Sequence, residues 1–231
     1  MNIFRKLFKN KRYLYCVACN QKHRSECFTI KSNSVGMCTD CYDKLLFTKK
    51  GSSFPALEPV DYLLSPLEYK NSAMDLLRHF KFRCDFKNSD IVNLIMSEFL
   101  KDYPHLSYFD LVIPVPLSAE RLSERGYNQS EIIARGISEA IGVELDTKSL
   151  VRTRNTKRQS SVFHTERVIN VKGAFSVNRT LTGKRIILVD DIYTTGNTMK
   201  NCAIALKYAG ATDIVGITAA TTMQKERPFL M

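Results

Sequence analysis

After residue 59, the spacing of hydrophobic residues changes repeatedly between strand-like and helix-like patterns. Short apolar runs between turn residues predict strands, and apolar residues three or four positions apart predict helices. Strands that alternate with helices are typical of a largely parallel sheet covered on both faces. The pattern predicts an α/β fold with strands at 60–67, 110–115, 185–189 and 213–220, and helices at 72–82, 89–103, 119–141 (interrupted by a turn at 125–128) and 197–209.

The first 58 residues have a different character. Residues 1–15 are basic, with apolar positions spaced for one face of a short helix or arm, and residues 16–47 hold five of the seven cysteines. The next stretch is rich in Gly, Ser and Pro, as linkers are. We expect a basic arm and a small zinc-ribbon-like module at 1–50, a linker at 51–58, and a doubly wound, mostly parallel α/β domain at 59–231.

Positive charge is concentrated in two segments of the 231-residue chain. The net charge is +11, yet residues 1–50 carry +8 and residues 151–185 carry +8, so the remaining residues carry −5. Residues 151–172 are polar and non-periodic, which predicts a long loop. Basic segments of this kind attract phosphates, on nucleic acid or on a small ligand, although a solvated basic surface has the same composition.

No apolar run approaches the length that crosses a bilayer, and the N-terminus lacks the apolar core of a secretory signal. We therefore expect a cytoplasmic protein without a membrane span. In the cytosol disulfides are rare, and paired cysteines are more often metal ligands.

Two Cys-x-x-Cys pairs, Cys16/Cys19 and Cys38/Cys41, stand 18 residues apart. Each pair can direct two sulfurs at one ion, and two pairs close a tetrahedral zinc site with a structural role. Cys27 and His23 lie between the pairs and are alternative ligands. A redox function is disfavoured because neither pair opens a helix within a βαβ unit. Cys84 and Cys202 are interpreted as core residues.

The run Ile186–Thr198 carries the strongest signal for a small-molecule site. Four apolar residues predict a buried strand, and Asp190 and Asp191 follow at its carboxyl end, where open α/β sheets bind ligands. Two adjacent buried carboxylates are unfavourable without a cation or donor hydrogens. The following turn offers backbone amides, hydroxyls and a helix N-terminus to a phosphate, although a capped helix start has the same composition. The turn residues are Thr194, Thr195, Gly196, Asn197 and Thr198.

This run resembles the motif with which type I phosphoribosyltransferases bind phosphoribosyl pyrophosphate (PRPP). The resemblance implies that Asp190 and Asp191 bind the ribose, with Mg²⁺, and that residues 194–198 hold the 5′-phosphate.

Further segments resemble the ComF family: Pro114–Ser118, Arg125–Gln129, Gly173–Phe175 and the residues around Lys81, preceded by the two cysteine pairs. Cys84 stands where the family pattern leads us to expect glycine. The resemblance implies a pyrophosphate site and a basic lid over it. The candidates for these are Lys81, Arg121, Arg125, Asn128, Gln129, Arg152, Gln159 and Arg167. For Arg121 and Arg125, helix-surface pairing with Glu120 or Glu124 is the alternative.

Two functions follow from the resemblance. In the first, the protein is a glycosyltransferase that uses Mg²⁺ and PRPP, with Lys81 and Arg125 as candidate catalytic residues and an acceptor that the sequence does not reveal. In the second, it is a non-catalytic module of natural competence that senses PRPP, or binds single-stranded DNA or a helicase-like partner. Aromatic residues within the basic segments favour base stacking, although we expect Tyr13 and Tyr15 to pack against the first cysteine pair.

Overall fold

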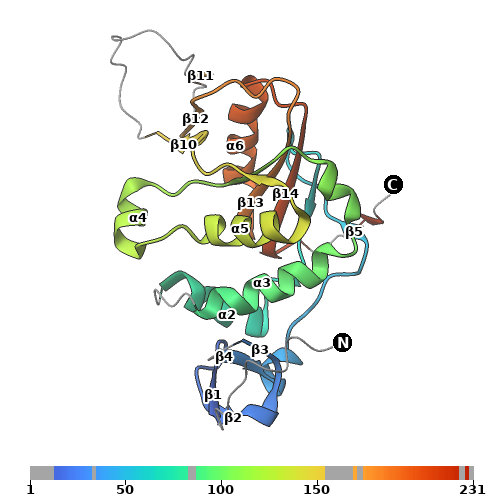
Figure 1. Cartoon of the computed structure of the whole chain (residues 1–231), viewed down its shortest axis with the longest axis vertical. Coiled ribbons are helices and arrows are strands. Elements are labelled where there is room, and N and C mark those ends of the chain that lie inside the picture. The colour runs from blue at the N-terminus through green and yellow to red at the C-terminus, as the bar shows by residue number, and fades with distance from the viewer. Residues whose placement is uncertain are drawn as a thin grey trace.

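The structure is a computed structural model that describes residues 13–32, 35–82, 87–153, 169–170, 174–223 and 227–228. At residues 82, 87, 169, 170, 227 and 228 only the backbone is described. Figure 1 shows a larger α/β lobe with a small β-rich lobe beneath it, next to helices α2 and α3. In the described part of the chain, no helix is long and apolar enough to span a membrane.

A parallel sheet lies at the centre of the larger lobe. Its strand order is β6–β14–β13–β8–β9, and β7 pairs with the far end of β14. The strands are β6 (Tyr62–Leu64), β7 (Leu67–Glu68), β8 (Leu111–Pro114), β9 (Glu144–Leu145), β13 (Arg185–Tyr193) and β14 (Asp213–Thr221).

The middle strand, β13, is buried on both faces. Its residues Ile186, Ile187, Leu188 and Val189 are all 0% exposed. Because successive side chains on a strand point to opposite faces, Ile187 and Val189 join one hydrophobic core and Ile186 and Leu188 join another. The alternation of strands and helices thus confirms the predicted α/β architecture.

Helices cover both faces of the sheet. The residues of α2, α3 and α5 contribute to the core that contains Ile187, whereas those of α6 contribute to the core that contains Ile186. Two antiparallel strands that flank the basic loop, β10 and β12, pack on the α6 side. The helices are α2 (Asn71–Phe82), α3 (Lys87–Leu100), α4 (Ala119–Arg125), α5 (Gln129–Ile141) and α6 (Asn197–Tyr208). A 3₁₀ helix covers Pro104–Tyr108, and the small sheet comprises β10 (Leu150–Arg152), β11 (Ile169–Asn170) and β12 (Phe175–Val177).

The stretch expected to be a linker takes part in the fold. Strand β5 (Ser52–Ser53) pairs with β15 (Arg227–Pro228) near the end of the chain. Phe54 is 2% exposed and its backbone bonds that of Leu63 in both directions. The stretch at 51–58 therefore follows an irregular course along the edge of the sheet, and its residues 52–54 form backbone contacts with the larger lobe.

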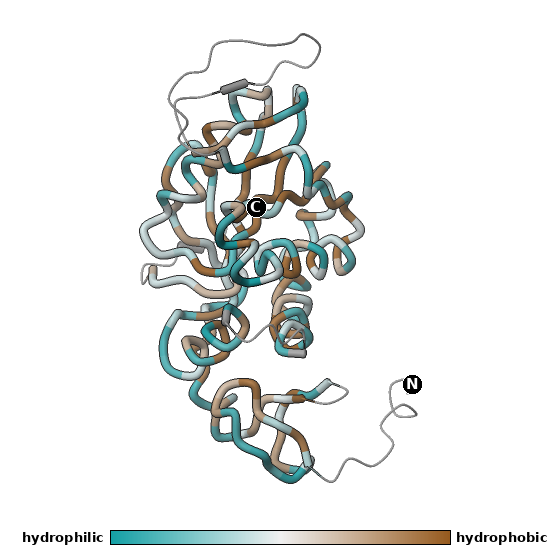
Figure 2. The backbone as a smooth tube through the Cα atoms, turned by 90° about the vertical axis from the view of Figure 1, so that its left-hand side faces the viewer, coloured by the Kyte–Doolittle hydropathy of each residue, from teal (hydrophilic) through white to brown (hydrophobic). Residues whose placement is uncertain are grey.

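The small lobe is a four-stranded sheet with the order β2–β1–β4–β3. Its buried hydrophobic residues belong to the same core cluster as those of α2, α3 and α5. Figure 2 shows this lobe at the lower end of the molecule. The strands are β1 (Tyr13–Cys16), β2 (Lys22–Arg24), β3 (Phe28–Lys31) and β4 (Val35–Cys38), and α1 (Thr39–Tyr42) follows β4.

Candidate functional site

The acidic pair, Asp190 and Asp191, lies on strand β13. The strand runs to Tyr193, so Asp190 and Asp191 lie within it rather than after it, four residues beyond the start of its apolar run. Asp191 is 9% exposed and Asp190 is half-buried. Asp190 is paired with Thr218 of β14, and the pairing of the two strands continues beyond the acidic pair at Ile192 and Tyr193.

Asp190 receives two hydrogen bonds through one oxygen. The hydroxyl of Ser130 and the backbone amide of Asp191 donate to its Oδ1 over 2.8 Å and 2.9 Å. Burial and the neighbouring carboxylate of Asp191 nevertheless raise the pKa of Asp190 to about 7, and the hydrogen bonds and Lys81 offset only part of this effect. The pair is therefore poised to accept a cation or hydroxyl donors at neutral pH.

Lys81 forms an ion pair with Asp191. Its Nζ lies 2.9 Å from Oδ2 of Asp191, and the exposed fractions of the two side chains are 24% and 12%. Lys81 lies on the last turn of α2, 110 positions before its partner. The fold thus brings this predicted pyrophosphate residue directly to the predicted ribose residue.

The predicted turn at 125–129 joins three elements at this place. Gly126 has φ +76° and ends α4, while Asn128 begins α5 by accepting a hydrogen bond from the amide of Ser130. The side-chain amide of Asn128 donates to the carbonyl of Val115 over 3.0 Å, which fixes the turn to the end of β8.

The same turn also fixes the end of α2. The hydroxyl of Tyr127 donates to the carbonyl of Phe80, and Nε2 of Gln129 donates to the carbonyl of Lys81 over 3.4 Å. Nη1 of Arg125 donates to Oε1 of Gln129 over 3.2 Å. Gln129 is 1% exposed, so in this structure it acts within the framework of the site.

The loop after β13 leads directly into helix α6 and has exposed polar side chains. The side chains of Thr194, Thr195, Asn197 and Thr198 are exposed, and the backbone of Gly196 is buried with φ +77°. Helix α6 starts at Asn197, and the residue at its cap position is a glycine, which offers no side chain to its first amides. Unbonded amides at a helix start, with exposed hydroxyls beside them, are the groups with which proteins bind anions.

The remaining pyrophosphate and lid candidates differ in what the structure shows of them. Arg121 is exposed on α4. Arg152 is exposed on β10, with its guanidinium carbon 5.5 Å from the ring centroid of Phe175. Gln159 and Arg167 lie outside the described residues.

Three residues contact the site but were not among the predicted residues: Ser130, Tyr127 and Tyr193. The only sequence signal for Ser130 was its position in the first turn of a helix, directly after the Arg-Gly-Tyr-Asn turn.

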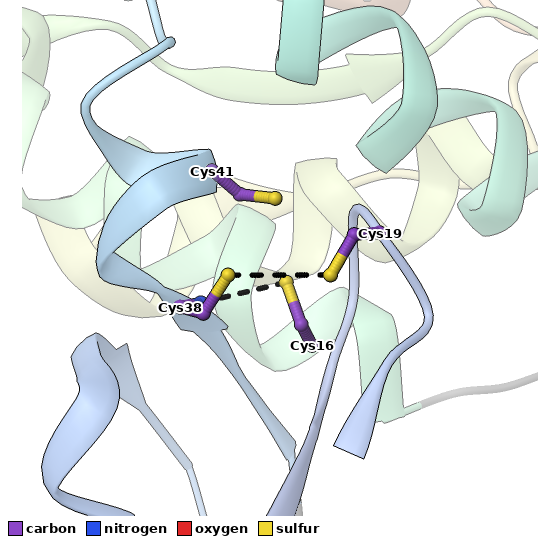
Figure 3. Close-up of side chains that lie close together, drawn as sticks. All are labelled: Cys16, Cys19, Cys38 and Cys41. Atoms are coloured by element: carbon purple, nitrogen blue, oxygen red, sulfur yellow. Dashed lines mark hydrogen bonds between the residues drawn. The ribbon is translucent and has the colours of Figure 1, made fainter. Parts of the chain in front are cut away.

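The four cysteines of the two pairs converge in the small lobe. Their sulfur atoms all lie within 4.8 Å of one another, and Cys19 Sγ is 4.0 Å from Cys38 Sγ (Figure 3). Tetrahedral zinc with its usual zinc–sulfur bonds separates sulfurs by about 3.8 Å, so the donor set and its spacing fit zinc. Burial raises the pKa of Cys38 to about 11, and a divalent cation would offset this cost of ionisation.

The two alternative ligands lie outside the sulfur cluster. Cys27 is exposed on a single 3₁₀ turn at Ser25–Cys27. Nε2 of His23 lies 3.5 Å from Sγ of Cys19, a hydrogen-bond distance for sulfur. His23 therefore contacts one of the four sulfurs from outside the cluster, and hydrogen bonds of this kind orient the ligands of metal sites.

The two tyrosines of β1 were expected to pack beside the first cysteine pair, but both are largely exposed. Tyr13 and Tyr15 are 45% and 54% exposed, because the side chains of β1 alternate and Leu14 and Cys16 occupy the buried face. The sequence alone could not settle which of the two faces the core would cover.

Comparison with known proteins assigns this arrangement to a class. Residues 123–228, which include the acidic pair, the loop and helix α5, match the model of the phosphoribosyl transferase domain. The chain is 33% identical over 180 residues to competence protein ComFC of Streptococcus pneumoniae, covering 77% of this chain and 73% of the relative. The chain therefore belongs to the ComFC family.

Two other relatives and one solved structure also match the chain. Competence protein ComFC of Bacillus subtilis is 34% identical over 62% of this chain and 56% of its own. DNA utilization protein YhgH of Escherichia coli K12 is 28% identical over 66% of this chain and 69% of its own. The purine phosphoribosyltransferase structure from Pyrococcus horikoshii matches 58% of this chain and 72% of its own, at 20% identity and a TM-score of 0.35.

Proposed function

We propose that this protein binds PRPP together with Mg²⁺ in the cytoplasm, at the site formed by β13, the loop 194–198 and the end of α2. The observation that carries the proposal is the pairing of Asp190 and Asp191 with Ser130 and Lys81 beside an exposed loop of hydroxyls and amides. Bound Mg²⁺ would offset the charge of the pyrophosphate.

Different residues of the proposed site bind different parts of PRPP. Asp190 and Asp191 accept the ribose hydroxyls or a cation, and the loop at 194–198 surrounds the 5′-phosphate. Lys81 changes partner from Asp191 to the pyrophosphate oxygens, where its charge stabilises the anion that forms if the C1–oxygen bond breaks. If the protein is catalytic, it transfers the phosphoribosyl group to a nucleophile with release of pyrophosphate.

Calorimetry of PRPP binding with and without Mg²⁺ tests this proposal. The double variant Asp190→Asn/Asp191→Asn should lose Mg²⁺-dependent binding. The double variant Asp43→Asn/Asp213→Asn removes the same charge from residues outside the site and should retain it. Absence of binding by folded, zinc-loaded wild-type protein would refute the proposal.

A second candidate function, binding of single-stranded DNA, is favoured by the exposed face of the small lobe. Tyr13 stands opposite Arg24 and Tyr15 opposite Lys22 in the β1–β2 register, and Nζ of Lys22 lies 5.3 Å from the ring centroid of Tyr13. Exposed aromatic rings flanked by cations stack bases and attract the backbone. The names of the relatives, a competence protein and a DNA utilization protein, support a role in DNA uptake.

Fluorescence anisotropy with labelled oligothymidine tests the second candidate. The variant Tyr13→Ser/Tyr15→Ser should weaken binding about tenfold or more, because each stacked base contributes about 1–3 kcal/mol. Affinity should fall steeply with salt. The Asp190→Asn/Asp191→Asn variant should bind DNA normally, and unchanged affinity in the tyrosine variant would exclude this surface.

A further inference from the structure

Three consecutive residues in the last turn of α2 contact three different parts of the molecule. His79 contacts the first cysteine pair, the carbonyl of Phe80 accepts from Tyr127, and Lys81 contacts Asp191. His79 and Lys81 are two residues apart, a rise of about 3 Å along a helix. Among the described residues, this turn therefore connects the backbone between the first two cysteines to the acidic pair.

The contact of His79 is with the backbone of the first cysteine pair. Its Nδ1 lies 3.0 Å from the carbonyl oxygen of Val17, so the ring donates its Nδ1 proton there. Val17 lies between two sulfur donors, is 4% exposed, and donates its own amide to the carbonyl of Gly36 over 2.8 Å. A metal that holds Cys16 and Cys19 in place thereby also holds the carbonyl that His79 contacts.

The other end of the connection has little freedom. Lys81 is half-buried, its backbone carbonyl accepts from Gln129, and the preceding carbonyl accepts from Tyr127. The Lys81 ammonium group therefore contacts Asp191 from a stretch of backbone that two hydrogen bonds hold in place. A small displacement of this turn lengthens a contact that is now 2.9 Å.

We propose that His79 is a positioning residue. It transmits the order of the metal-bound segment Cys16–Cys19 through α2 to Lys81, and so fixes the geometry of the acidic pair for its ligand. This inference rests on the proposed binding of PRPP at that pair. It makes the zinc module part of the sugar-phosphate site through one hydrogen bond. The alternative is that His79 only fills space between the lobes.

Chemical footprinting tests the connection without any ligand. Lys81 should be acetylated slowly in wild-type protein because Asp191 and burial protect it. The variant His79→Ala should raise its rate several-fold, whereas His79→Asn, whose side-chain amide can donate to Val17, should restore protection. Arg78→Ala, which removes an exposed neighbour on the same helix, is the matched control, and Lys70 is the internal reference in the mass spectra.

PRPP affinity tests the consequence. With zinc content confirmed by elemental analysis, His79→Ala should weaken Mg²⁺·PRPP binding about tenfold, within the usual range of coupling between sites. The effect should vanish when Lys81 is already replaced by Ala, because the two residues act through one contact.

The two measurements separate the possible failures. Unchanged acetylation of Lys81 in zinc-loaded His79→Ala overturns the inference, whether or not PRPP binds. Additive losses in His79→Ala and Lys81→Ala overturn it as well, since additivity indicates a general loss of stability. Wild-type protein that shows the footprint but no PRPP binding refutes the proposed function and leaves the connection between the two sites standing.

Discussion

A methyl group built on Gly196 would lie 2.2 Å from the hydroxyl oxygen of Tyr193. Tyr193 is 4% exposed and its hydroxyl accepts a hydrogen bond from the amide of Leu57 over 3.2 Å, so the ring cannot withdraw freely. The loop at 194–198 thus lies directly against an aromatic ring at the end of the preceding strand.

Replacing Gly196 by Ala should therefore distort the loop. The positive φ alone costs roughly 1–2 kcal/mol for a residue with a side chain, and the clash adds to it. Gly142→Ala is a matched control, because Gly142 has φ +73° and no atom within 4 Å of an added methyl group. Denaturant unfolding should show a larger loss for Gly196→Ala, and only that variant should lose PRPP affinity. Equal losses in both variants would contradict the role of Tyr193.

The pKa of Asp190 predicts a pH dependence of ligand binding. Because burial and Asp191 raise that pKa to about 7, affinity for Mg²⁺·PRPP should rise as the pH increases from 6 to 8. Ser130→Ala removes a hydrogen bond that lowers this pKa and should shift the midpoint to higher pH. Calorimetry across this range should show the change, and Asp190→Asn serves as the control for titration of PRPP itself.

The same pKa has a consequence for the ligand-free protein. The folded chain retains a proton on Asp190 that the unfolded chain releases near its ordinary pKa of 3.8. The contribution of this group to the free energy of unfolding therefore falls as the pH rises from about 4 to about 7. Thermal melts of wild type and Asp190→Asn should diverge over this window; parallel curves would contradict the raised pKa.

The cysteine cluster predicts unequal effects of two Cys→Ser substitutions. Cys38→Ser removes one of four converging sulfurs and should abolish stoichiometric zinc and reduce folded protein, since the metal contributes folding energy. Cys27→Ser changes an exposed thiol and should retain one zinc per chain. Elemental analysis and circular dichroism provide the readouts, and zinc loss in Cys27→Ser would place that residue among the ligands.

Asn128 has two tasks that substitution can separate. Asn128→Ser retains an acceptor for the amide of Ser130 but removes the donor to Val115, whereas Asn128→Ala removes both. Loss of the cap should cost about 1 kcal/mol, so Ala should be less stable than Ser by that amount in urea unfolding. A smaller effect in Ala than in Ser would contradict the capping role.

Periodicity was sufficient for the parts of the fold that local patterns determine. The strands at 185–189 and 213–220 and the helices after Asn71 and Asn197 occur within a few residues of their predicted bounds, since their apolar spacing decides both period and burial. The segment at 60–67 instead forms two short strands, β6 and β7. Strand ends at a sheet edge depend on partners that a single segment does not reveal.

The contacts that make the site were less accessible from sequence. The approach of Lys81 to Asp191 spans 110 positions, and the hydrogen bonds of Tyr127 and Gln129 to α2 depend on how the fold brings the end of α2 to the turn before α5. Motif resemblance indicated most of these residues as candidates for ligand binding, but it did not reveal contacts among them, such as those of the Gln129 side chain with Arg125 and Lys81. Residue type and spacing predict candidates, and only packing assigns their partners.

The continuous core shared by the two lobes also determines how the protein unfolds. Met37 of the small sheet and Leu77 of α2 are each 0% exposed within it, so a cut after residue 58 would open a hydrophobic surface on both fragments. The chain should therefore unfold as one cooperative unit, and its metal centre should behave as a folding requirement for the whole protein rather than as a removable appendage.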